Sequence, residues 1–144
     1  MGDRCWLQIR VRKQDAALWD KIWANGKDPP RFKDWLSEIT EETTGTLTGQ
    51  ADEANYGWQT ELEEAAKLGC VFQGSHGEGG CYGAAEFAGI GGEYFEYEVG
   101  HDGDPVVTMN PKTLSIPKKF REELRKQMNG CERASKALNK LEGA

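Results

Sequence analysis

The sequence lacks any apolar run long enough to cross a membrane. No window approaches the roughly 20 apolar residues that a transmembrane helix needs, and 29 % of the 144 residues are charged. The first residues have neither the basic stretch nor the apolar stretch of a secretory signal, so we expect a cytoplasmic protein. These absences exclude a membrane-embedded protein. They favour a single compact domain over residues 1–144, because domains commonly have about 100–150 residues.

Paired metal-ligand motifs are also missing. The chain has four cysteines, no two of them in a CxxC pair, and only two histidines. Reduced, buried thiols are the usual state of such cysteines in the cytosol, and we expect neither a metal nor another cofactor. The alternative is a zinc protein whose ligand spacing differs from that of structural zinc sites, with the ligands Cys70, His76, Cys81 and His101.

The glycine-rich segment 74–92 lacks the features of a nucleotide-binding loop. After Gly77 and Gly79, Tyr82 stands where a dinucleotide-binding turn needs its third glycine, and the loop has no lysine for a phosphate. We therefore predict a mobile hairpin loop here. A small enzyme with a Cys81 thiol activated by His76 is an alternative, but we favour a protein without catalytic residues.

Positive charge is nearly absent from the middle of the chain. Residues 34–105 hold 16 acidic side chains and a single cation, Lys67, which gives a net charge of −15. Residues 1–33 have a net charge of +4 and residues 106–144 a net charge of +5, so the total of −6 hides a segregation. A strongly negative region repels nucleic acid and attracts basic surfaces.

What the sequence does contain is a series of periodic segments. Alternating apolar residues predict a half-buried strand over 5–12. Apolar residues at helical spacing predict three helices: one between an N-cap at Asp15 and Gly26, one over 32–39 and one over 57–68. Further strands are predicted over 70–73, 93–99 and 106–109, with a short strand or extended loop over 43–48 and a polar connector over 52–56.

The last quarter of the chain is predicted to be helical and basic. Ser115 is a suitable cap, Pro117 fits the first turn, and Asn129-Gly130 is expected to interrupt the helix. We therefore predict an α+β fold: an antiparallel or mixed sheet of four to five strands, covered by helices, with a long basic C-terminal helix.

The acidic residues are the predicted functional feature. The alternation over 93–99 predicts that Tyr94, Glu96 and Glu98 face solvent, where they would join helical carboxylates in a continuous negative patch. The predicted partner-binding residues are Glu38, Glu41, Glu42, Glu61, Glu64, Glu93, Tyr94, Glu96, Glu98, Asp102 and Asp104. Such a patch suits a non-enzymatic protein that binds a basic, nucleic-acid-binding partner protein by imitating the phosphates of a duplex.

In size and composition the chain resembles the small phage and plasmid inhibitors of host defence, anti-CRISPR and anti-restriction proteins among them. The resemblance rests on a short, acidic sequence without catalytic motifs, and it implies an inhibitor encoded by a mobile element. A nucleic-acid binder that uses the basic ends is a further alternative, since Trp6 and Arg10 share one face of the first predicted strand.

Overall fold

The computed structural model describes residues 3–142 and confirms the predicted α+β class. Its centre is one antiparallel sheet with the strand order β2-β3-β1-β4-β5-β6. The sheet has six strands rather than the expected four to five: β1 (Arg4–Arg12), β2 (Glu38–Glu42), β3 (Thr46–Asn55), β4 (Phe72–His76), β5 (Ala85–Ile90) and β6 (Glu93–Glu98). No helix in the described part of the chain combines the length and apolarity needed to cross a membrane.

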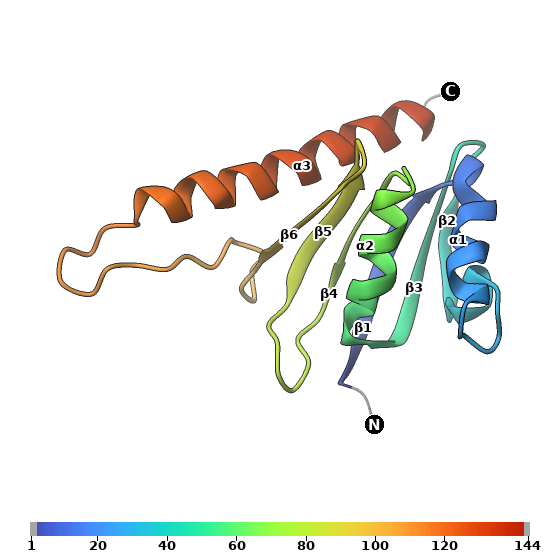
Figure 1. The fold of residues 1–144 in the computed structure, drawn as a ribbon, viewed down its shortest axis with the longest axis horizontal. Helices are drawn as coiled ribbons and strands as arrows, with labels where there is room; N and C mark the ends of the chain where they lie inside the picture. The colour runs from blue at the N-terminus through green and yellow to red at the C-terminus, as the bar shows by residue number, and fades with distance from the viewer. Residues whose placement is uncertain (1–2, 143–144) are drawn as a thin grey trace.

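Two short helices, α1 (Ala16–Ala24) and α2 (Gln59–Lys67), cover one face of the sheet, which we call the α1/α2 face (Figure 1). The alternating residues of β1 point into this layer, and Leu7 and Ile9 are fully buried. A cluster of aromatic rings fills the space between helices and sheet. Its ring contacts join Trp19, Trp23, Phe32, Trp58 and Phe72. Burial of large aromatic side chains contributes strongly to stability, so this layer is the main core.

A single long helix, α3 (Lys118–Glu142), runs across the opposite face, the α3 face (Figure 1). The expected interruption at Asn129-Gly130 is wrong, because α3 continues through both residues. Gly130 explains the continuity: it is buried directly against the ring of Phe95 on β6, where a Cβ atom would overlap the ring. The missing side chain therefore lets the helix approach the sheet.

The predicted helix over 32–39 is wrong. Only a 3-10 turn, η2 (Phe32–Trp35), forms there, and Glu38–Glu42 is strand β2 at the edge of the sheet. Pairing with β3 overrides the helical spacing, with Glu38 opposite Gln50. Leu36, between η2 and β2, lies against Gly49 of β3. The predicted polar connector over 52–56 is mostly strand as well, because β3 continues to Asn55.

Two smaller expectations also fail. The predicted strand over 106–109 is absent, and only an isolated bridge between Val99 and Pro105 closes the turn after β6. Asp15 precedes α1 as expected, but its side chain does not cap the helix. The carboxylate instead accepts hydrogen bonds from the Arg12 guanidinium, at 2.8 and 3.0 Å, and from the Val71 backbone N–H at 3.0 Å. It therefore ties β1 to the start of β4.

Candidate functional site

The acidic residues do not gather on a single surface. Glu38, Glu41 and Glu42 lie on β2, whereas the acidic residues from Glu93 to Glu98 lie on β6, at the opposite edge of the sheet. Five strand spacings of about 4.8 Å separate the two edges by roughly 24 Å. Glu61 and Glu64 lie on α2, and Asp102 and Asp104 follow β6 in a turn. The predicted continuous patch is thus divided among several places.

Most of these carboxylates remain without an ion-pair partner. Among the described residues, ion pairs engage five of the sixteen acidic side chains of residues 34–105: Glu42, Glu53, Glu61, Glu93 and Glu96. The partners Lys13, Arg4 and Lys27 come from the basic N-terminal segment, and Lys126 comes from α3. The basic ends therefore neutralise only part of the acidic segment.

The expected exposure of Tyr94 is wrong, because both faces of β6 are covered at Tyr94 and Phe95, whereas Glu98 at the end of the strand is exposed as expected. Phe95 is buried under α3, and Tyr94 packs against the core of the α1/α2 face. Burial, reinforced by the charges of Glu96 and Glu63, raises the pKa of Tyr94. Tyr94 is therefore not a solvent-facing anchor residue. Alternation indicated which residues share a face, but not that a helix would cover each face.

Glu96 is engaged by a buried histidine. The His76 side chain is 5 % exposed, and its Nε2 lies 3.3 Å from a carboxylate oxygen of Glu96. Its Nδ1 lies 2.8 Å from the carbonyl oxygen of Gly77. Burial alone would lower the pKa of His76, but the hydrogen bonds with Glu96 and Gly77 outweigh it, and the pKa is raised. The His76–Glu96 pair connects β4 to β6 across β5 and therefore stabilises this part of the sheet.

The four candidate zinc ligands are dispersed. Cys70 is buried at the end of the α2 connection, His76 is bound to Glu96, and Cys81 and His101 are exposed in separate loops. Over the described residues, no three His, Cys, Asp or Glu side chains gather closely enough to hold a metal ion. Zinc binds cysteine as the thiolate, and burial raises the pKa of Cys70 to about 12, which disfavours that form.

The glycine-rich segment contains more order than the predicted mobile loop. Ala85–Ile90 is strand β5, and the tip of the loop is attached to the start of β1 through Asp3. The Asp3 carboxylate accepts hydrogen bonds from the backbone N–H groups of Gly80 and Cys81, at 2.6 and 2.7 Å. These bonds lower the pKa of Asp3. The Tyr82 hydroxyl donates a further bond to the Asp3 carbonyl oxygen at 2.9 Å.

Beside this loop lies a pocket of about 530 Å³, which we call the Trp6 pocket. One wall is Trp6, on the polar side of β1, with 47 % of its surface exposed. Glu78, Glu86 and Glu98 are among the lining residues, and none of the lining residues is a lysine or an arginine. The strand register places the side chain of Glu86 on the α3 face and that of Glu98 on the α1/α2 face. His101 also lines the pocket, in the turn that carries Asp102 and Asp104. The pocket is therefore strongly negative.

Two glycines make room for the walls of the Trp6 pocket. Gly77 lies against the indole of Trp6, and Gly83 lies against the carboxylate of Glu98. A Cβ atom at either position would overlap these groups. Glycine at these two positions thus allows an aromatic ring and a carboxylate to approach the backbone closely. These close contacts explain two of the glycines in the glycine-rich segment.

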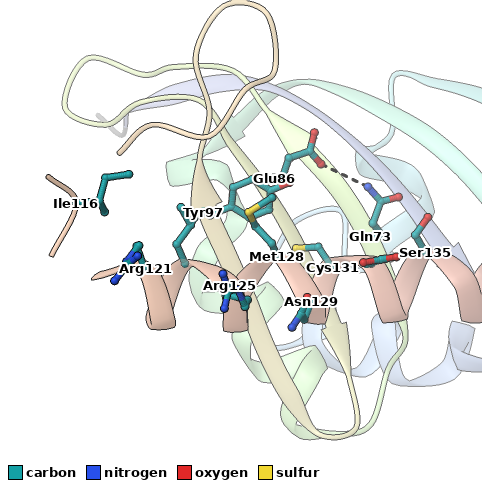
Figure 2. A pocket seen from close by; sticks show the side chains of 12 residues that line it. Gln73, Glu86, Tyr97, Ile116, Arg121, Arg125, Met128, Asn129, Cys131 and Ser135 are labelled. Atoms are coloured by element: carbon teal, nitrogen blue, oxygen red, sulfur yellow. Dashed lines mark hydrogen bonds between the residues drawn. The ribbon is translucent and has the colours of Figure 1, made fainter. Parts of the chain in front are cut away.

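Glu86 connects this pocket to a longer groove. On β5 it stands between Ser75 of β4 and Tyr97 of β6, and it lines the Trp6 pocket and two neighbouring pockets. Figure 2 shows the largest of these three, about 700 Å³, which lies between the sheet and the part of α3 from Arg121 to Ser135. In it the Glu86 carboxylate accepts a hydrogen bond from Gln73 Nε2 at 3.4 Å. Burial raises the pKa of Glu86.

Of the predicted binding residues, only Glu98 lines the Trp6 pocket, with Asp102 and Asp104 in the adjoining turn. Glu86 was not among the predicted binding residues, and Trp6 was named only in the nucleic-acid-binding alternative, together with Arg10. The available signal was an aromatic residue on the polar face of a strand, and a glutamate that alternates with Ala85 and Phe87. In comparisons with known proteins, the chain matches no family model, no curated protein and no solved structure.

Proposed function

We propose that this chain is a small, non-enzymatic binding protein that presents acidic surface to a basic, nucleic-acid-binding protein. Its most concrete form is an inhibitor of host defence encoded by a phage or another mobile element, of the anti-CRISPR or anti-restriction type. The observation that carries the proposal is the number of carboxylates in residues 34–105 that have no ion-pair partner among the described residues, eleven of sixteen.

The region around the Trp6 pocket is the part of this surface that we assign to the partner. Four exposed carboxylates border or follow the pocket, and we call them the acidic rim: Glu78, Glu98, Asp102 and Asp104. None of the four has an ion-pair partner among the described residues. A concentrated negative field of this kind accelerates encounter with a basic partner and weakens with added salt.

A matched pair of charge reversals tests the proposal. The rim variant carries Glu78→Lys, Glu98→Lys and Asp104→Lys. The control variant carries Glu38→Lys, Glu41→Lys and Asp52→Lys, which reverse the same number of unpaired carboxylates on β2 and β3. Both variants and the unmodified chain are added to purified DNA-binding defence enzymes, restriction endonucleases and Cas effectors, bound to fluorescent duplex DNA.

The unmodified chain is expected to displace DNA from at least one enzyme. The rim variant should lose at least about tenfold in potency, whereas the control variant should stay within about threefold, because rim charges act locally under screening by salt. Failure of the unmodified chain to displace DNA from any enzyme would contradict the inhibitor function. Equal loss in both variants would show that net charge, rather than the acidic rim, carries the effect.

A further inference from the structure

We propose that the Trp6 pocket is a receptor for an arginine side chain of the basic partner. The inference rests on the proposed function and states what the partner must insert. The pocket combines one exposed aromatic wall, the glutamates Glu78 and Glu86, and a lining without lysine or arginine. The negative lining favours a cation, and the aromatic wall favours a planar one.

The indole of Trp6 supplies the stacking surface. Trp6 belongs to the polar face of β1, and one edge of its ring rests on Gly77. Nearly half of the residue remains exposed, unlike Trp19, Trp23 and Trp58, which are buried in the core. A guanidinium group stacks on an indole face more favourably than an ammonium group does, because it is planar and less strongly hydrated.

The carboxylates supply the acceptors. Glu86 is half-buried and has no ion-pair partner among the described residues, and the single donor to its carboxylate in that part of the chain is Gln73 Nε2 at a long 3.4 Å. Glu78 lies in the loop after β4, and the Glu98 carboxylate lies against Gly83, on the other face of the sheet from Glu86. A guanidinium has five N–H donors in a rigid fork, which match carboxylates in bidentate pairs.

The size of the pocket agrees with an inserted side chain. Its volume of about 530 Å³ falls within the range of roughly 300–1,000 Å³ that is typical of ligand sites. The neighbouring groove shares Glu86 and is lined by the apolar residues Leu124 and Met128 and by the cations Arg121 and Arg125. Apolar residues that flank the inserted arginine can pack on Leu124 and Met128, whereas the two arginines disfavour further positive charge in this groove.

Calorimetric titration with a defined peptide tests the inference independently of any partner protein. The probe is a decapeptide of alternating arginine and glycine, and the matched control replaces each arginine by citrulline, which keeps the shape and removes the charge. The arginine peptide is expected to bind at least about tenfold more tightly than the citrulline peptide. Equal affinity for the two peptides would overturn the inference.

Variants then locate the binding site. Trp6→Ala and Glu86→Gln should each weaken arginine-peptide binding by about tenfold, whereas Glu38→Gln, on the opposite edge of the sheet, should leave it unchanged. Unchanged binding in both pocket variants, with native circular dichroism, would place the peptide elsewhere and refute the pocket. If Trp6→Ala still displaces DNA as well as the unmodified chain does, the pocket inference fails while the proposed function stands. If the chain binds the arginine peptide but displaces no DNA, the proposed function is contradicted and the pocket inference stands.

Discussion

The two faces of the sheet come from the same strands, yet they differ in almost every physical property. On the α1/α2 face, two helices and η2 enclose a continuous cluster of aromatic and aliphatic side chains. On the α3 face, a small cluster around Ala88, Phe95 and Ala134 packs the helix on the sheet, and the rest is a groove of mixed polarity in which Glu86 lines three adjoining pockets. Burial of apolar surface provides most of the stability of a domain, so we assign stability to the first face and recognition to the second.

The tryptophans give the sharpest test of this difference. Trp23→Ala on the α1/α2 face should lower the free energy of unfolding by about 3–5 kcal/mol, because it empties a fully buried site. Trp6→Ala on the α3 face should change it by less than about 1 kcal/mol, as is usual for exposed positions. Urea denaturation followed by circular dichroism measures both. A large loss in Trp6→Ala would show that the α3 face also carries the fold.

The packing of α3 can be tested at Gly130. Alanine normally stabilises a helix relative to glycine by about 1 kcal/mol, but here a methyl group would overlap the Phe95 ring. We expect Gly130→Ala to destabilise the protein by about 1–3 kcal/mol, measured by denaturation. The control is the exposed neighbour Asn129→Ala, which should be neutral or slightly stabilising. Stabilisation by Gly130→Ala would contradict the close approach of α3 to β6.

The ion pair between His76 on β4 and Glu96 on β6 should make the stability of the protein depend on pH. The pKa of His76 is raised above its ordinary value of 6.5, so the contribution of the charged pair is complete below pH 6.5 and is lost as the pH rises through the folded-state pKa. The melting temperature should therefore decline over this range in the unmodified chain. Glu96→Gln should remove most of that dependence, and an unaltered pH profile in this variant would argue against the pair.

The smallest predicted effect is local to the glycine-rich loop. Asp3→Ala removes the carboxylate that accepts the N–H groups of Gly80 and Cys81. Hydrogen exchange at these two amides should become faster, because local opening no longer breaks those bonds. Exchange in the buried strand β4 should not change. If both amides keep their protection in Asp3→Ala, something other than Asp3 holds the loop.

The sequence predicted the α1/α2 face much better than the α3 face. Strict alternation in β1 and helical spacing around Trp19 and Trp58 both arise from one-sided burial, which is the condition under which these patterns are informative. In the middle of β6 both faces are covered, so the pattern did not reveal that Tyr94 is covered. β5 was hidden among glycines, and the continuity of α3 depends on a contact between Gly130 and Phe95 that no local pattern contains.

The binding residues were likewise predicted only in part, because local sequence patterns do not show which strands become neighbours in the sheet. Charge segregation identified an acidic segment, and of its predicted binding residues Glu98 lines the Trp6 pocket while Asp102 and Asp104 follow in the adjoining turn. The position of Glu38 and its neighbours on the far edge depends on strand order, which the sequence does not specify directly. Trp6 and Glu86 come together only because β1, β4 and β5 are neighbours in the sheet.

The five tryptophans allow the central claim to be tested in one measurement. Their indole N–H signals are recorded by ¹⁵N–¹H NMR while the arginine–glycine decapeptide is added. The account predicts that the Trp6 signal moves and that those of Trp19, Trp23 and Trp58, buried on the α1/α2 face, stay in place. A stationary Trp6 signal, or movement of the buried signals instead, would contradict the division of the sheet into a face that holds the fold and a face that recognises a basic partner.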